Sequence, residues 1–198
     1  MALDLGDVPT WIASIGTVGA LGAALIQINT ERARRLQDEA QKREDDHRAP
    51  AMLVAGYIIP QTQSRADGDL ARTPICLMNN AYAPVYRLVA GMVAVRGDGP
   101  QKIEDILQAR QPGQGVPVTT ISILPPGLSQ VVIKNTERSG VGEGRAGVET
   151  AFTDMQGSHW IRRATGELEE IPCEPFEHYA KAGLQEPFEI QYPEPFSG

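Results

Sequence analysis

Hydrophobic positions are unevenly spread along this chain, and the longest uninterrupted run of them lies near the start. Residues 11–28 are eighteen consecutive positions without an ionisable side chain. A helix rises about 1.5 Å per residue, so this run would reach roughly 27 Å, close to the ~30 Å hydrocarbon core of a bilayer. The pattern predicts a membrane-anchoring helix within residues 1–29. The alternative is a helix buried inside a water-soluble protein.

The apolar character of this run is moderate, because small and polar residues interrupt the larger hydrophobic ones. Ser14, Thr17, Gln27 and the glycines reduce the free energy of insertion that the isoleucines, leucines and valine supply. The balance therefore favours insertion by a narrow margin.

Charged residues on either side of the run predict an orientation in the membrane. Asp4 and Asp7 precede it, whereas Arg32, Arg34 and Arg35 follow it. Basic residues stay on the cytoplasmic side, and a cleaved signal peptide would have the opposite polarity. We therefore expect a single-pass protein of the cell membrane, with its N-terminus outside and the rest of the chain in the cytoplasm.

Small residues recur along one face of the same predicted helix. Gly16, Ala20 and Ala24 are spaced four positions apart, which lets a second helix approach closely. Besides the lipid bilayer, a second copy of this helix is therefore a candidate partner, in a homodimer. The alternative is that the spacing arises by chance, because alanine and glycine are common in membrane helices.

Residues 30–50 are rich in charged helix formers and poor in apolar ones. Glu31 and Arg35 are one of several oppositely charged pairs four residues apart, which stabilise an exposed helix. The sequence predicts a solvated helical stalk that continues the first helix and ends before Pro50, because the residue before a proline avoids the helical conformation.

Short apolar runs separated by turn residues follow from residue 51 to residue 170. The predicted strands are residues 52–59, 74–78, 85–95, 118–124 and 130–134, with a hairpin at 148–163. Residues 102–110 carry apolar positions at helical spacing and predict one short helix. Several short strands with regular turns are typical of an immunoglobulin-like β-sandwich.

The net charge of −7 is concentrated at the C-terminal end. Residues 166–198 contain eight glutamates and one lysine, while the rest of the chain has seventeen acidic and seventeen basic residues. Binding to nucleic acid requires lysines and arginines gathered on one face. The distribution therefore argues against nucleic acid as a partner.

Residues 171–198 are an acidic tail in which Glu-Pro-Phe occurs three times. Repeated proline predicts an irregular segment, and we expect it to wrap back over the β domain. The alternative is a linear motif that presents aromatic side chains to a partner protein. The candidate partner-binding residues are Phe176, Phe188, Tyr192 and Phe196.

No pattern in the sequence predicts catalytic residues, a cofactor or a metal. The three histidines, His47, His159 and His178, lie far apart and have no ligand spacing. A site built from dispersed loop residues such as Asp154, His159 and Arg162 remains an alternative that leaves no motif.

Four stretches together carry a resemblance to a known group of proteins. They are DVPTWIASIGTVGALGAAL, the basic stalk, PVYRLVAGMV, and AFTDMQGSHWIRRATGELEE with its Pro/Glu/Phe tail. The chain resembles uncharacterised single-pass membrane proteins of actinobacteria. The resemblance implies the same architecture and no particular chemistry.

These patterns predict a membrane-tethered binding or scaffold module that engages a protein partner. The alternative is a small enzyme or ligand-binding protein. A pocket with converging ionisable groups would favour the alternative, and a shallow apolar surface would favour the binding module.

Overall fold

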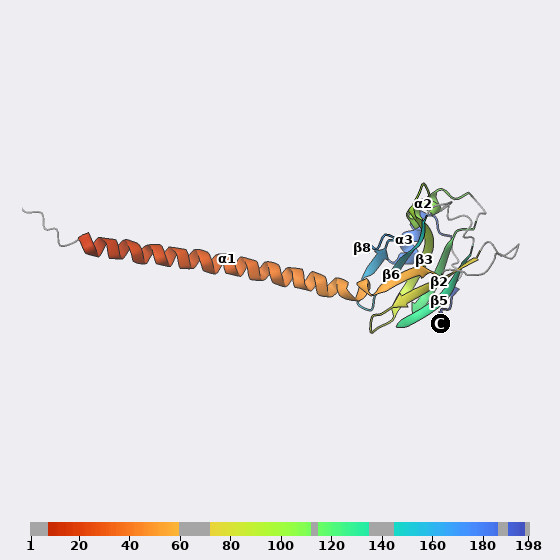
Figure 1. Ribbon diagram of the computed structural model, residues 1–198, viewed down its shortest axis with the longest axis horizontal. Helices are drawn as coiled ribbons and strands as arrows, with labels where there is room; N and C mark the ends of the chain where they lie inside the picture. The colour runs from red at the N-terminus through yellow and green to blue at the C-terminus, as the bar shows by residue number, and fades with distance from the viewer. Residues whose placement is uncertain (1–7, 60–71, 112–114, 135–144, 186–189, 197–198) are drawn as a thin grey trace, which may run out of the picture. The chain divides into compact units, whose positions relative to one another are not determined.

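The computed structural model describes residues 8–59, 72–111, 115–134, 145–185 and 190–196 (Figure 1). For residues 8–26, 28 and 29 it describes only the helical backbone. The chain divides into two compact units, residues 1–48 and residues 49–198.

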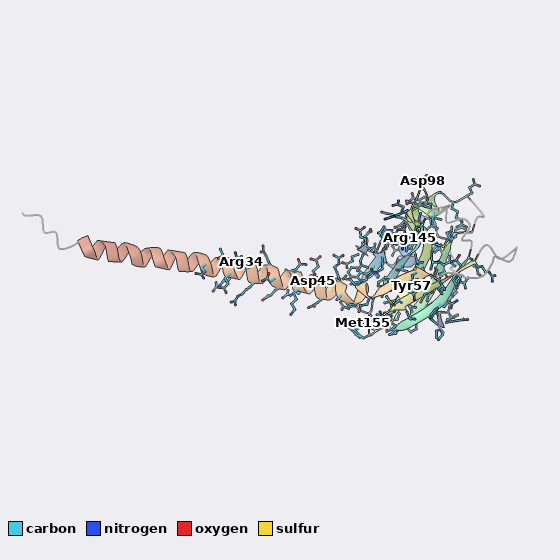
Figure 2. All side chains as sticks on the ribbon, viewed as in Figure 1. Arg34, Asp45, Tyr57, Asp98, Arg145 and Met155 are labelled. Carbon is cyan, nitrogen blue, oxygen red and sulfur yellow. The ribbon has the colours of Figure 1, made fainter. Side chains whose placement is uncertain are left out.

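The first unit consists of most of one long helix, α1 (Val8–Met52). Gln27 and residues 30–46 are exposed, and Arg34 and Asp45 project from the helix in Figure 2. The predicted pair forms, with Arg35 Nη2 at 2.9 Å from Glu31 Oε1. The helix ends two residues beyond Pro50, contrary to our prediction, because Ala51 is fully buried in the core of the second unit.

The predicted membrane-spanning helix is contradicted. Across the described part of the chain, no helix is both long enough and apolar enough to cross a bilayer. The predicted run was already diluted by glycine, serine, threonine and Gln27, and α1 continues from it without a break into an exposed, charged segment. The side chains of Gly16, Ala20 and Ala24, predicted to mediate self-association, lie outside the described residues.

The second unit is mostly β, with two sheets, as predicted. The small sheet contains four strands in the order β1 (Val54–Ile58), β2 (Arg72–Asn79), β5 (Gly127–Lys134), β10 (Glu194–Pro195). The large sheet contains six strands in the order β8 (Leu168–Ile171), β7 (His159–Arg162), β6 (Arg145–Thr153), β3 (Val85–Arg96), β4 (Val118–Leu124), β9 (Ile190–Gln191). Neighbouring strands are antiparallel, except that β4 and β9 are parallel.

The two faces of the large sheet are both buried. One face packs against the small sheet, and the other packs against α2 (Ile103–Gln108) and α3 (Pro175–Ala182). The core between the sheets includes Ile75, Leu77, Leu88, Ile121, Phe152 and Trp160. The core beneath the helices includes Val89, Val93, Ile103, Leu107, Ile161 and Tyr179. The second unit is therefore built in three layers.

A glycine in β3 allows α2 to approach the large sheet closely. A Cβ atom at Gly91 would lie 2.7 Å from both Cγ1 and Cδ1 of Ile103, the first residue of α2. Ile103 is fully buried. The absence of a side chain at position 91 thus fixes where α2 begins.

Elements that we did not predict lie mainly in the last thirty residues. Here α3, β9 and β10 replace the predicted irregular tail, and β8 precedes them. Pro175 does not prevent a helix, because it occupies the first turn of α3, where a missing N–H costs nothing. Gly183, with φ of 116°, ends α3 in the left-handed conformation.

We expect Gly91→Ala to lower the free energy of unfolding by about 1–3 kcal/mol, because the new methyl group overpacks against Ile103. Ile103→Val alone should cost about 1 kcal/mol. Because valine removes Cδ1, the double variant should be destabilised by less than the sum of the two. Urea unfolding measures all three, and strictly additive losses would contradict the contact.

Candidate functional site

The most unusual side chain in the second unit is Glu149, a carboxylate that is fully buried in β6. It lies beside Gly91 of β3, on the face of the large sheet that the helices cover. Buried carboxylates are expensive unless they are hydrogen-bonded or paired with a charge. The partners of Glu149 therefore decide how this layer is held together.

Both carboxylate oxygens of Glu149 have partners from other elements. The backbone N–H of Ile103 donates to Oε1 at 3.1 Å, and the hydroxyl of Tyr179 donates to the same atom at 2.9 Å. Nη1 of Arg163, just after β7, donates to Oε2 at 3.1 Å. One side chain thus fastens the start of α2 and the middle of α3 to the sheet.

Arg163 extends this network toward the surface. Nη1 also donates to both oxygens of Glu104 in α2, at 3.1 and 3.0 Å. Nε and Nη2 bond to the two oxygens of Glu169 in β8, at 3.0 and 2.9 Å. His178 of α3 lies with Nε2 at 3.0 Å from Glu104 Oε1. We call this set the charge cluster: Glu104, Glu149, Arg163, Glu169, His178 and Tyr179.

The pKa values of the three carboxyls move in different directions because their surroundings differ. Burial raises the pKa of Glu149, and the nearby positive charge of Arg163 only partly opposes that rise. Burial also disfavours the charged form of Glu104, but hydrogen bonds with His178 and Arg163 outweigh it, so that its pKa is lowered. The hydrogen bond from Arg163 lowers the pKa of Glu169. Burial raises the pKa of Tyr179, which therefore stays protonated and donates to Glu149.

The charge cluster connects several elements of the fold, and its ionisable groups are engaged mainly with one another. Glu149 has three partners, and Arg163 is almost enclosed by three carboxylates. The bonds connect the large sheet with both helices, connect its strands, and connect α2 with α3 through Glu104 and His178. We therefore assign the cluster a structural role, in which it fixes α2 and α3 on the large sheet.

The dispersed residues proposed as an alternative site do not converge. Asp154 accepts hydrogen bonds from the backbone N–H groups of Gln156 and Ser158 and from Trp160 Nε1, at 2.8, 3.0 and 2.8 Å. His159 Nδ1 lies 3.0 Å from the hydroxyl of Thr153. The guanidinium of Arg162 donates to the carbonyl oxygens of Met52 and Gly166. Asp154 is a turn anchor, and the other two residues point to separate partners.

A shallow apolar hollow, open to solvent, lies beside the turn that Asp154 anchors. It is lined by Pro50, Ala81, Tyr82, Ala83, Pro84, Val85, Asp154, Met155 and Gln156. Asn79 holds one side in place, because its Nδ2 donates to the carbonyl oxygens of Ala83 and Leu124. Tyr82 and Met155 are both exposed at this site.

A second group of apolar side chains lies on the outer side of the small sheet. Val54, Ile75, Leu77, Val131 and Ile133 pack into the core between the sheets, so the alternate positions of the same strands point away from it. We call this surface the open face. Its outward residues are Ala55 and Tyr57 of β1, Pro74, Cys76 and Met78 of β2, and Leu128, Gln130 and Val132 of β5.

The composition of the open face differs from that of an ordinary solvated sheet. One-sided antiparallel sheets normally alternate apolar residues inside with polar residues outside. Here Tyr57 is 44% exposed and Leu128 is 43% exposed, and the outward positions between them carry no charge. Cys76, which lies between them, is fully buried, and the remaining outward residues are partly buried. Arg72 and Lys134, directly paired across β2 and β5, place positive charge at one end of the face.

The predicted partner-binding aromatics are separated by the fold. Phe176 packs against the core beneath the helices. Tyr192 is 85% exposed between β9 and β10, whereas Phe196 is half-buried, with its backbone N–H bonded to the carbonyl of Leu128 at 3.1 Å. Phe188 lies outside the described residues. Phe196 therefore borders the open face, and Phe176 belongs to the interior.

Sequence reasoning missed both the charge cluster and the open face, although each left a trace. Glu149 interrupts the apolar strand VETAF, which is an unusual place for a charge. In β1 and β2, apolar residues occupy both alternations of the strand, although only one of them is needed for the core. Neither trace identifies the partners of these residues.

Arg163→Met should lower the free energy of unfolding by about 3–5 kcal/mol, because it leaves Glu149 buried without its counter-charge. The matched control is Lys181→Ala, which removes an exposed pair with Glu177 and should leave stability unchanged. Chemical unfolding measures both. Similar losses in the two variants would contradict a structural role for the cluster.

Acid should destabilise the second unit through Glu104 and Glu169. Their pKa values are lower in the folded chain than the usual 4.5, so the stability they contribute is present above that pH and is lost as pH falls through the lower folded values. Glu149, with a raised pKa, acts in the opposite sense. Urea midpoints between pH 7 and pH 3 should therefore fall, and Glu104→Gln should make the fall shallower. An equal slope in the variant would refute the contribution of Glu104.

Comparison of the chain with protein-family models, with curated proteins and with solved structures found no match.

Proposed function

We propose that residues 49–198 form a protein-binding module that engages its partner through the open face. The observation that carries this proposal is the run of apolar residues at the outward positions of β1, β2 and β5, among which Tyr57 and Leu128 are exposed. Exposed apolar side chains that share one face of a sheet are a feature of interaction sites.

The rigidity of the open face supports a binding role. Each outward side chain stands on an antiparallel strand whose alternate residues are fixed in the core. Such a surface needs little ordering when a partner arrives, so less of the interaction free energy is lost to conformational entropy. Tyr57 (Figure 2) is further held by a hydrogen bond with Cys76, which contributes most to the raised pKa of its phenol.

The enzyme alternative has less support. Asp154, His159 and Arg162 have separate partners, and the residues of the charge cluster are bonded to one another. A catalytic site needs groups that converge on a space where a substrate can sit. The apolar hollow near Met155 is the other surface to which a partner could bind. The crosslinking experiment below distinguishes a partner at the hollow from a partner at the open face.

Photo-crosslinking in the native cell tests this proposal with the full-length chain. A benzophenone amino acid replaces Tyr57, Leu128, Met155 or Asp98 in turn, and the joined protein is identified by mass spectrometry. We expect the same protein to be captured from positions 57 and 128, because both lie on the open face. Asp98 is exposed on a loop after β3 and serves as the control (Figure 2).

The position of capture decides the outcome. A protein captured from position 155 and not from 57 or 128 would place the partner at the hollow and overturn the proposal. Capture at equal yield from position 98 would show unspecific reaction and would also count against it. Thermal unfolding of each variant confirms that it is folded.

A further inference from the structure

We infer that Arg96 and Arg145 together form a binding site for a phosphate monoester group. This site is separate from the open face, and neither one depends on the other. The inference follows from the direct pairing of the two arginines across β3 and β6, from the irregularity in β3 that creates the pairing, and from the state of both side chains.

Arg96 and Arg145 (Figure 2) are direct cross-strand partners in the large sheet, and both are exposed. In the part of the chain that the structure describes, neither side chain forms an ion pair or a hydrogen bond. Direct partners share one face of a sheet with their Cβ atoms about 4.5–5.5 Å apart, and two like charges in this arrangement are destabilising. Proteins accept such a local conflict at functional sites. An anion held between the two guanidinium groups would remove the repulsion.

An irregularity in β3 creates this pairing. Ala94 pairs with Ala146 and Arg96 pairs with Arg145, so β3 has one extra residue, Val95, over this stretch. A regular ladder would place Val95 opposite Arg145. Bulges of this kind re-aim side chains and are frequent next to functional sites.

A glycine in β6 accommodates the extra residue. A Cβ atom at Gly147 would lie 2.5 Å from Val95 Cγ2 and 2.9 Å from the Cβ atom of Ala164. Because Gly147 has no side chain, Val95 packs onto the sheet at this point, and Arg96 takes the position opposite Arg145.

The backbone on both sides of Arg96 is held in place. Gly97 has a φ of 110°, which starts a turn directly after the arginine. The backbone N–H of Ala94 donates to the carbonyl oxygen of Pro100 at 2.8 Å, so the turn folds back along β3. Asp98 is exposed in this turn and forms no ion pair with Arg96. A ligand would therefore meet a backbone that needs little ordering.

Two neighbouring guanidinium groups suit a phosphate better than a carboxylate. One arginine already satisfies both oxygens of a carboxylate in a bidentate pair. A phosphate monoester has three acceptor oxygens and a charge of about −1.5 to −2 at pH 7. It therefore accepts N–H groups from both arginines and balances both charges.

The positions of the basic residues argue against nucleic acid as the ligand. Arg72 and Lys134 form a second basic pair, across β2 and β5, on the outer side of the small sheet. Ala146 packs between the sheets, so Arg145 lies on the opposite face of the large sheet, toward the helices. The two pairs are on opposite sides of the sandwich and form no continuous track for a chain of phosphates.

Nuclear magnetic resonance of the full-length chain tests the inference with inorganic phosphate, phosphoserine and dimethyl phosphate at constant ionic strength. We expect the Nε–H resonances of Arg96 and Arg145 to shift together and to saturate with the first two ligands. The diester should bind about fivefold more weakly, because it has one charge and two free oxygens. The single variants Arg96→Gln and Arg145→Gln identify the two resonances.

The double variant Arg96→Gln and Arg145→Gln should bind inorganic phosphate about tenfold more weakly. Because the variant lacks the repulsion between the arginines, it should unfold at a higher urea concentration than the native chain in phosphate-free buffer. The matched control is Arg72→Gln with Lys134→Gln, which removes the same charge from the other basic pair and should leave phosphate binding unchanged.

A library of peptides with a central phosphoserine distinguishes the two sources of the phosphate group. Peptides that bind at least tenfold more tightly than inorganic phosphate would identify a phosphorylated protein segment, and equal affinities would identify a free phosphate ester. The inference is overturned if the two resonances shift no more than that of Arg72, if the diester binds as well as the monoester, or if the double variant keeps the native affinity. These results leave the crosslinks from positions 57 and 128 unaffected, so failure here is distinct from failure of the open face.

Discussion

The pairing of Glu149 with Arg163 is the interaction on which the three-layer arrangement depends. A charge in the middle of a buried strand would oppose folding if it stood alone, because its desolvation costs several kcal/mol. Here the cost is offset by contacts that come from α2, from α3 and from the end of β7. The bonds that offset the desolvation cost of Glu149 also hold α2 and α3 on the large sheet. Polar contacts therefore position the helix layer together with the apolar core beneath it.

This arrangement makes the two sheets unequal. The large sheet is buried on both faces, between the small sheet and the helices, whereas the described outward residues of the small sheet are partly exposed, apart from the fully buried Cys76. Its outer residues are nevertheless apolar, and Tyr57 and Leu128 are accessible. The fold thus covers one apolar sheet face with its own helices and leaves Tyr57 and Leu128 exposed on the other.

Much of the β architecture could be predicted from the sequence, because it follows from local patterns. The strands near Val85 and Val118 and the hairpin around Asp154 have clear alternation and turn residues, and the short helix at Ile103 has apolar spacing. The predicted membrane helix was wrong because the argument relied on the length of an apolar run whose hydrophobicity was marginal. The tail was predicted as irregular because Pro175 was counted as a helix breaker, although it occupies the one position where a helix accepts proline.

The charge cluster and the open face could not be predicted in the same way. Glu104, Glu149 and Arg163 are separated by up to 59 residues in the chain, and their meeting depends on strand order and on where α2 begins. The open face depends on which side of the small sheet receives the large one. Both are properties of tertiary packing, which periodicity along a single strand does not reveal.

The position of α3 near the end of the chain has a consequence for biosynthesis. Glu149 obtains its bond from Tyr179 only after thirty further residues have been added, and β9 and β10 complete the edges of both sheets later still. Because these contacts join distant parts of the chain, the ribosome must release nearly the whole polypeptide before the last layer can assemble. Nascent chains that stop short of α3 would expose the apolar outer side of the large sheet and would become substrates for chaperones or proteases.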